Sequence, residues 1–282
     1  MTRPAEPEDA HAFTRIESQA NPRFRALLAL VDSAHERRKR GRSVLEGHKL
    51  IESFVSRAGA DDDGAALHEL YVSESALGRG SIRLLLQRAA IAPVVLDDRL
   101  LKRASRQATP DGTIAVIETP VPRLPERLRG DMVYLDGLQD PGNLGTILRS
   151  CAAAGIGTVL TSPDTAFCWS PKVLRAGMGA HFALMIHEGV TADELWRRLD
   201  PAQPVWATTA PGAEASRALY EADLKGAGLW LFGAEGQGLG EELLVASVHR
   251  LSIPQVRAVE SMNVAAAVAV CLFEQRRQRL CE

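Results

Sequence analysis

Residues 136–149 read Asp136-Gly-Leu-Gln-Asp-Pro-Gly-Asn143-Leu-Gly145-Thr-Ile-Leu-Arg149. The apolar run Met132–Leu135 comes directly before this stretch, and small and apolar residues with helical spacing follow it to Ala154. A turn rich in Gly and Pro therefore joins a buried strand to a helix, with Asn143 as a candidate N-cap. That explanation does not cover Arg149, the charged residue of an otherwise small and apolar helix, which must either reach solvent or meet an anion.

Short apolar strands and helices continue to alternate beyond this stretch. The pattern predicts an α/β domain over residues 131–282, with a mostly parallel sheet covered by helices on both faces. The expected strands are Met132–Leu135, Thr158–Thr161, Phe182–Ile186, Val205–Thr208, Leu229–Phe232 and Leu251–Ile253. The expected helices are Gly145–Ala154, Ala192–Leu199, Glu241–Ala246 and Ser261–Leu280.

The chain ahead of this domain divides into three parts. Residues 1–20 are polar and predict a poorly ordered tail, residues 21–118 a smaller α/β domain, and residues 119–130, with three prolines, a linker. The smaller domain has expected helices Arg23–Val31, Glu46–Arg57 and Ser81–Ala90 and expected strands Leu70–Val72, Val94–Leu96 and Thr113–Ile117.

Two further polar loops follow strands of the larger domain, at Gly233–Leu239 and Pro254–Asn263. Ligands of parallel sheets bind at the carboxyl ends of the strands, so three such loops indicate one site. Each loop also has a purely structural explanation, a tight turn for the first and helix capping by Ser261, with Asn263 in the first turn, for the second. The glycine order is neither a dinucleotide fingerprint nor a P-loop.

Composition and charge limit the function classes. The formal net charge is −2, so nucleic-acid binding requires a local patch, and Arg37–Arg42 is the candidate, with a solvated helix or loop face as the alternative. Four scattered cysteines without a Cys-x-x-Cys motif predict neither a metal site nor a redox motif. The longest apolar run, Val264–Phe273, is too short for a membrane span, and residues 1–20 lack the apolar core of a signal peptide. We therefore expect a cytoplasmic protein without membrane association.

Taken together and in this order, the three loops resemble the SpoU family of RNA 2′-O-methyltransferases, within the SPOUT superfamily. The matching residues are Asn143, Gly145 and Arg149; Phe232, Gly233, Glu235, Gly238 and Leu239; and Ile253, Pro254, Glu260, Ser261, Asn263, Val264 and Ala265. The segment Ser170–Ala180 is similar to a connection in a ribosomal-RNA-directed branch. Over residues 21–118 the resemblance is weaker, to a ribosomal-protein-like substrate-binding domain, and rests on Glu46-Gly47 and Thr109-Pro110-Asp111-Gly112.

The resemblance implies a trefoil-knotted fold, a homodimer and S-adenosyl-L-methionine as cofactor. The implied cofactor contacts are Thr209, Gly233, Glu235, Ile253 and Met262. The implied catalytic residues are Arg149, Asn143, Glu235, Ser261 and Asn263. Because a guanidinium is a poor base, we expect Arg149 to hold a phosphate and stabilise the forming alkoxide, with Asn143 and Asn263 orienting Arg149 and the ribose.

We expect RNA to contact the smaller domain and the edge of the active site. The candidate residues are Arg37, Arg38, Lys39, Arg40, Arg42, Lys172 and Arg175. The apolar stripe of the last helix (Val264, Val268, Cys271 and Leu272) is either a dimer face or core.

The expected reaction is 2′-O-ribose methylation of structured RNA, with ribosomal RNA favoured over transfer RNA. The alternatives are a transfer-RNA methyltransferase and a non-catalytic RNA-binding or ribosome-assembly factor on the same fold. Arg257 stands where the family usually has a glycine, and it is the feature that favours the non-catalytic alternative.

Overall fold

The computed structural model describes residues 13–57, 66–210, 215–244, 248–256 and 262–280. The chain forms two compact units, Met1–Thr119 and Pro120–Glu282, and each is described by itself.

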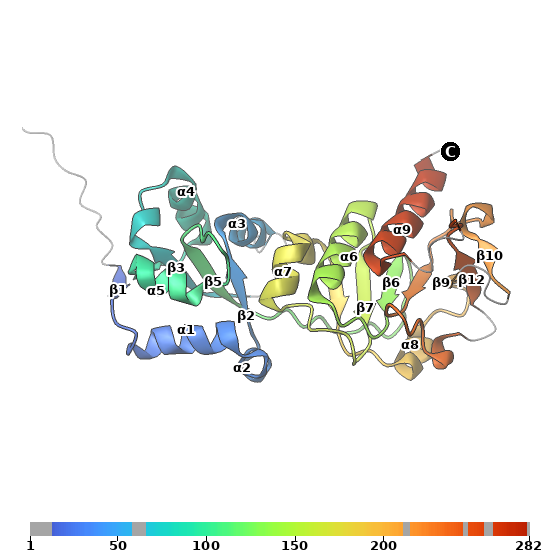
Figure 1. The fold of residues 1–282 in the computed structure, drawn as a ribbon, viewed down its shortest axis with the longest axis horizontal. Coiled ribbons are helices and arrows are strands. Elements are labelled where there is room, and N and C mark those ends of the chain that lie inside the picture. The colour runs from blue at the N-terminus through green and yellow to red at the C-terminus, as the bar shows by residue number, and fades with distance from the viewer. Residues whose placement is uncertain (1–12, 58–65, 211–214, 245–247, 257–261, 281–282) are drawn as a thin grey trace, which may run out of the picture. The chain divides into compact units, whose positions relative to one another are not determined.

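The first unit is built on a five-stranded mixed sheet with the strand order β1-β4-β3-β5-β2. Its strands are β1 Thr14–Ile16, β2 Arg42–Glu46, β3 Leu67–Ser73, β4 Val94–Leu96 and β5 Thr113–Glu118. Its helices are α1 Pro22–Asp32, α2 Ala34–Arg40, α3 His48–Arg57, α4 Gly80–Ala89 and α5 Asp98–Ala104, with the 3-10 turn η1 Glu74–Ala76. Helices α1 and α5 pack on one face of the sheet, while α3 and α4 lie on the other (Figure 1).

Two expectations for this unit are corrected. The expected tail is wrong at Thr14–Ile16, which pair in parallel with Val94–Leu96, because Ile16 is buried in the core beside Phe24. Residues 1–12 lie outside the described residues. The helix expected from Glu46 begins at His48 instead, since Arg42–Glu46 forms a strand that pairs with β5.

The second unit is built on a seven-stranded parallel sheet with the order β10-β12-β9-β11-β6-β7-β8. Its strands are β6 Met132–Leu135, β7 Thr158–Thr161, β8 Met185–His187, β9 Val205–Thr208, β10 Arg217–Ala218, β11 Leu229–Phe232 and β12 His249–Ser252. Its helices are α6 Pro141–Ala154, α7 Pro171–Gly177, α8 Ala192–Arg198 and α9 Val264–Leu280, with the 3-10 turns η2 Ala180–Ala183, η3 Leu219–Glu221 and η4 Glu241–Leu243.

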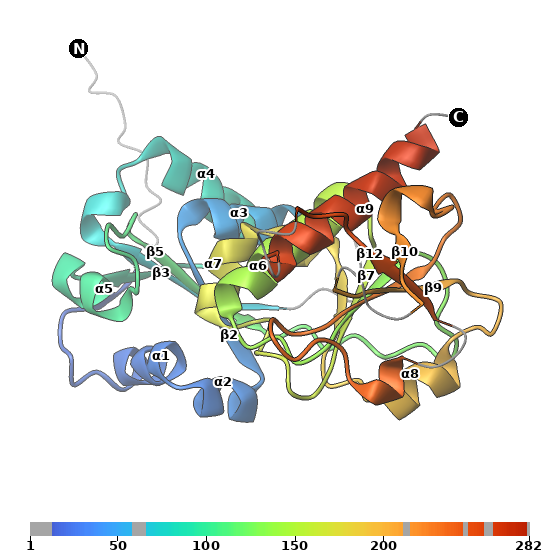
Figure 2. The same ribbon diagram turned by 45° about the vertical axis from the view of Figure 1, so that its right-hand side comes forward.

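Helices cover both faces of this sheet, as expected. Helices α6, α7 and α9 lie on one face and α8 on the other (Figures 1 and 2). Because side chains alternate along a strand, Leu229 and Leu231 pack toward α8. Trp230 instead contacts Trp206 with its ring tilted by 41° and bonds to α9. In the last helix, Val264, Val268, Cys271 and Leu272 are all buried, so that stripe belongs to the core of this unit.

The α6–α7 contact explains a glycine of the quoted stretch. A side-chain carbon at Gly145 would lie 2.5 Å from the Cβ of Ala176 and 2.6 Å from the carbonyl oxygen of Val173. Gly145 therefore lets α7 approach the backbone of α6, which is a packing role. Helix α7 itself was not expected from the sequence pattern.

Other element boundaries differ from expectation. The helix expected over Glu241–Ala246 is the short turn η4 in its described part, and the strand expected from Phe182 begins at Met185. The expected linker is too long, because Leu128 is 2% exposed and its N–H donates to the carbonyl of Arg198. No helix in the described ranges is long and apolar enough to cross a membrane.

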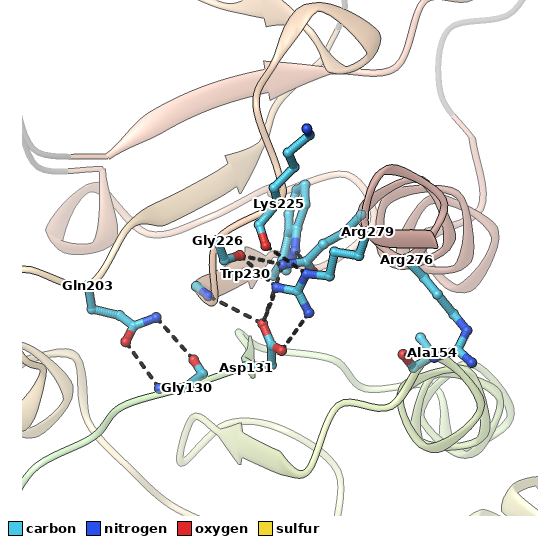
Figure 3. A network of polar contacts seen from close by, with 11 residues as sticks. Gly130, Asp131, Ala154, Gln203, Lys225, Gly226, Trp230, Arg276 and Arg279 are labelled. Atoms are coloured by element: carbon cyan, nitrogen blue, oxygen red, sulfur yellow. Dashed lines mark hydrogen bonds and ion pairs between the residues drawn. The ribbon is translucent and has the colours of Figure 1, made fainter. Parts of the chain in front are cut away.

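A polar clasp fastens the end of α9 to the start of β6; Figure 3 shows its members Asp131 and Arg279. The third member is Gln275. The guanidinium of Arg279 donates to both oxygens of Asp131, at 2.7 and 2.8 Å, and also to the carbonyls of Lys225 and Gly226. Gln275 donates to Asp131 and accepts from the indole of Trp230. The carboxylate of Asp131 raises the pKa of Arg279 above its ordinary value. These bonds tie three segments that are distant in sequence.

We predict that Arg279→Ala lowers the free energy of unfolding by about 2 kcal/mol, because a partly buried carboxylate loses its cation. The matched control is Arg197→Ala, whose side chain is 66% exposed and pairs with Asp193, 89% exposed, on α8. That change is expected to cost less than about 1 kcal/mol. Urea denaturation of both variants measures the difference, and equal losses would contradict a special role for the clasp.

Candidate active site

Three polar side chains from the three loops meet in one hydrogen-bonded cluster. One carboxylate oxygen of Glu235 accepts from Asn143 Nδ2 at 3.2 Å, from Asn263 Nδ2 at 2.8 Å and from the N–H of Val264 at 3.0 Å. Asn263 Nδ2 also donates to Asn143 Oδ1 at 3.1 Å. The prediction that these loops converge is therefore confirmed for Asn143, Glu235 and Asn263, which we call the amide–carboxylate cluster.

The caps of the two helices differ from expectation. Asp140, and not Asn143, caps α6, since its Oδ1 accepts from the N–H of Asn143 at 2.7 Å. At α9 the capping oxygen is Oδ1 of Asn263, which accepts from the N–H groups of Ala265 and Ala266. Ser261, expected to be this cap, lies outside the described residues. Because Asp140 is the cap, the Asn143 side chain is left for the cluster.

The loop after β11 folds back on itself. A side-chain carbon at Gly233 would lie 2.1 Å from the carbonyl of Gly238, and the N–H of Gly238 donates to the carbonyl of Ala234. Gly236 and Gly238 both have positive φ, at 90° and 73°, which favours glycine. The glycines are thus explained by the loop's own turn, which holds Glu235 toward α6 and α9.

A cavity of about 310 Å³ lies beside the cluster. Its walls come from the loop after β6, the first turn of α6, the loop after β11 and the first residue of α9. The lining residues are Gly137, Leu138, Gln139, Asp140, Asn143, Ala234, Glu235, Gln237 and Val264. A cavity at the carboxyl ends of parallel strands with a fixed carboxylate and two amides is suited to a small polar ligand.

Comparison with known proteins identifies the family. The SpoU rRNA Methylase family matches residues 131–273. The chain belongs to this family. It is 32% identical over 270 residues to an uncharacterized tRNA/rRNA methyltransferase of Synechocystis, with 94% of each chain covered. It is 30% identical to the 23S rRNA (guanosine-2′-O-)-methyltransferase RlmB of Vibrio vulnificus, with 79% of this chain and 94% of the relative covered. A crystal structure of an AdoMet-bound rRNA methyltransferase from Sinorhizobium meliloti superposes with a TM-score of 0.78 at 27% identity, covering 94% of this chain and 98% of that one.

The residues expected to hold the SpoU cofactor lie close to one another in the topology. Ile253, Thr209 and Gly233 directly follow the neighbouring strands β12, β9 and β11. Thr209 is tied to β12, because its N–H donates to the carbonyl of Leu251 at 2.9 Å. Met262 directly precedes Asn263. Of the expected contacts, Glu235 also lines the cavity.

Arg149 does not join the cluster. It is exposed on α6 and makes no hydrogen bond or ion pair with any described part of the chain. Six residues of helix separate it from Asn143, which amounts to about 9 Å along the axis and roughly 240° around it. Within one chain the two asparagines bond to Glu235 and not to Arg149, and their role in orienting Arg149 stays a prediction.

Arg37, one of the residues expected in the RNA-binding patch, is buried. Arg37 is 6% exposed, and its guanidinium donates to the carbonyls of Leu30 and Val31, at 2.6 and 3.1 Å. The Arg37 guanidinium therefore caps the C-terminal end of α1. Burial lowers the pKa of Arg37 below its ordinary value. Its placement in the RNA patch is wrong, since it is not accessible.

The other basic candidates lie at or near the surface. Arg38, Lys39 and Arg40 are exposed on α2, with Arg40 paired to Glu36 at 2.9 Å, and Arg42 is half-buried. Lys172 and Arg175 are exposed one turn apart on α7.

Sequence reasoning missed Asp140 and Gln139. The signal for Asp140 was present, because Asp followed by Pro is the usual start of a helix, with Pro at its first position. Gln139 had no such signal, since its place in the cavity wall depends on how the loop after β6 closes. Arg257 and Glu260 lie outside the described residues.

Proposed function

We propose that this chain transfers a methyl group from S-adenosyl-L-methionine to the 2′-hydroxyl of a ribose in ribosomal RNA. The observation that carries the proposal is the amide–carboxylate cluster, at the carboxyl edge of a parallel sheet in a member of the SpoU rRNA Methylase family. The ribosomal substrate is supported by the similarity to RlmB, a 23S rRNA methyltransferase.

The residues present fit the cofactor. Three neighbouring strands end together at Ile253, Thr209 and Gly233, so backbone groups and one apolar side chain gather at one edge. Glu235 adds a carboxylate oxygen that bonds to no other described residue. When bound, the cofactor supplies a methyl group already activated by its sulfonium. Thr209, Gly233, Glu235, Ile253 and Met262 would hold it.

The protein's own residues orient the acceptor and assist loss of its proton. The amide–carboxylate cluster fixes Asn143 and Asn263 at the rim of the cavity, and Ser261 precedes Asn263 by two residues in the sequence. Arg149 grips the neighbouring phosphate and stabilises the developing alkoxide, since a guanidinium stays protonated and pairs with anions.

The first unit serves as the RNA-binding domain. The basic side chains of Arg38, Lys39, Arg40 and Arg42 at or near its surface support this role. Lys172 and Arg175 on α7 extend the basic surface of the catalytic unit. The larger unit is the trefoil-knotted SPOUT domain, consistent with the strand order β12-β9-β11-β6, in which the chain returns repeatedly to the middle of the sheet.

The active protein is a cytoplasmic homodimer. Arg149 has no partner in the described part of its own chain, and α9 presents the apolar side chains Phe273 and Leu280 to solvent, 46% and 72% exposed. Ala266, Phe273 and Leu280 follow one another at seven-residue spacing, so they share one helix face. The buried free thiols of Cys151, Cys168 and Cys271 suit a reducing compartment.

Methyl transfer from tritium-labelled S-adenosyl-L-methionine tests the proposal. The purified full-length protein is incubated with total ribosomal RNA and total transfer RNA from a strain lacking the enzyme. We expect label in ribosomal RNA, recovered in alkali-resistant dinucleotides that mark 2′-O-methylation. Label confined to transfer RNA would overturn the substrate, and cofactor binding without transfer to any RNA or ribosomal particle would favour the non-catalytic alternative.

A further inference from the structure

The loop after β11, residues 233–239, carries Glu235 and is closed at its base by one residue, Asp136. Asp136 directly follows β6, the strand that pairs with β11. Its N–H donates to the carbonyl of Phe232, the last residue of β11, at 2.9 Å. Oδ2 of its carboxylate accepts from the N–H of Gly240, the first residue after the loop, at 3.0 Å. Both ends of the loop are therefore bonded to the same residue, and we call this arrangement the Asp136 clip.

The backbone around Asp136 is held in place from the other side. The N–H of Gly137 donates to Oγ of Ser162, in the loop after β7, at 2.9 Å. The N–H of Ser162 donates in turn to the carbonyl of Leu135, also at 2.9 Å. Gly137 has a φ of 64°, and a side-chain carbon there would lie 3.8 Å from the Cβ of Ala234. The loop after β7 thus supports the residue that closes the loop after β11.

The composition of the loop explains why its base has to be closed. Three of its seven residues are glycine, and two of these have positive φ, so many backbone conformations are open to the loop. One oxygen of Glu235 nevertheless has to lie within 3.2 Å of two asparagine amides and of the N–H of Val264. Bonds from both ends of the loop to one fixed residue restrict the loop, and a carboxylate is a stronger acceptor for the Gly240 N–H than a neutral group.

We propose that Asp136 is a positioning residue for methyl transfer, which sets the place of the Glu235 carboxylate by closing the base of the loop. The described residues that line the cavity do not include Asp136, so its effect on the reaction passes through the loop. Gly233 and Glu235, both of which the proposed function assigns to the cofactor, belong to this loop. The Asp136 clip therefore acts on cofactor binding as well as on the rate, and in this respect the inference rests on the proposed function.

Two substitutions of Asp136 test the clip. Asp136→Ala removes the acceptor for the N–H of Gly240, whereas Asp136→Asn keeps a carbonyl oxygen that can accept from it. The affinity for S-adenosyl-L-methionine is measured by calorimetry, and the methyl-transfer rate on ribosomal RNA is measured in single turnovers at saturating cofactor. Both are measured at a temperature at which circular dichroism shows the variants folded.

We expect Asp136→Ala to weaken cofactor binding and to lower the rate, each by about tenfold, the loss equivalent to one hydrogen bond to a charged group. Asp136→Asn is expected to recover most of both. The matched control is Asp164→Ala, which replaces an exposed aspartate in the loop after β7 and is expected to change neither quantity.

A double-mutant cycle distinguishes a positioning role from a general loss of structure. Because Asp136 acts through Glu235, the variant with both Asp136→Ala and Glu235→Ala is expected to transfer methyl groups as fast as Glu235→Ala alone. Losses that multiply in the double variant would overturn the inference. An Asp136→Asn variant as impaired as Asp136→Ala, or an Asp136→Ala variant without a loss, would also overturn it.

The cofactor measurements separate this inference from the proposed function. A wild-type protein that binds S-adenosyl-L-methionine but methylates no RNA would contradict the proposed function, and the affinities of the Asp136 variants would still test the clip. Equal affinities of the wild-type protein and Asp136→Ala would overturn the inference alone. A wild-type protein that does not bind the cofactor would remove both.

Discussion

Replacing Arg149 by alanine is expected to lower the rate of methyl transfer by roughly 10²–10³-fold, the loss typical for removal of one group that stabilises an oxyanion. The side chain makes no bond with the described chain, so its removal leaves the fold and cofactor binding unchanged. The loss should therefore appear in the rate constant of methyl transfer measured under single-turnover conditions, with unchanged thermal unfolding. A variant that unfolds earlier, or that loses only RNA affinity, would contradict this role.

Arg149→Lys separates charge from geometry. A lysine keeps the positive charge but lacks the planar pair of donors that fits a phosphate and an alkoxide together. We expect this variant to stay well below the wild-type rate, and full activity would contradict the assigned role.

Mixed dimers test where Arg149 acts. Because Arg149 does not reach the amide–carboxylate cluster of its own chain, we expect it to serve the site of a second copy. Dimers that combine one Arg149→Ala chain with one Asn143→Ala chain, isolated through two different tags, should then regain activity at one of their two sites. Mixed dimers as inactive as either parent would place both residues in the same chain's site.

Much of the second unit could be predicted from the sequence, because its strands are short, apolar and bounded by polar loops. The strands Met132–Leu135, Thr158–Thr161, Val205–Thr208 and Leu229–Phe232 are found at the expected residues. Their order in the sheet could not be predicted. The spacing of apolar residues indicates which residues are buried. Which strands pair depends instead on how the connections between them cross the sheet.

The site illustrates the same limit. Asn143, Glu235 and Asn263 are polar, so each was a candidate for binding. Because ligands of parallel sheets bind at the carboxyl ends of the strands, their three loops were expected at one site. The division of labour could not be predicted, since an asparagine near a helix start is equally suited to capping and to binding. Asp140 takes the capping role at α6, and Asn263 takes both roles at α9. The burial of Arg37 could not be predicted either, because a run of basic residues does not show which side chain is buried.

Glu235→Ala is the second change with a large expected effect. Removing its carboxylate leaves the amides of Asn143 and Asn263 and the N–H of Val264 without their acceptor. The start of α9 and the rim of the cavity then lose their common anchor. We expect methyl transfer to fall by about 10²-fold or more, because misplacement by even 1 Å can cost that much. The control is Glu241→Ala, which replaces an exposed glutamate in η4 and is expected to leave the rate of methyl transfer unchanged.

Glu235→Gln decides whether the anchor or the negative charge is needed. Glutamine keeps a carbonyl oxygen that can accept from the same three donors, although these bonds are weaker without the charge. If Glu235 acts as an anchor, the glutamine variant should recover most of the activity lost in Glu235→Ala. If it acts through its charge on the cofactor or on the proton to be removed, both variants should be equally inactive. Because one oxygen of Glu235 holds both asparagines and the first N–H of α9, we expect the anchoring result, read as a rise in kcat from alanine to glutamine.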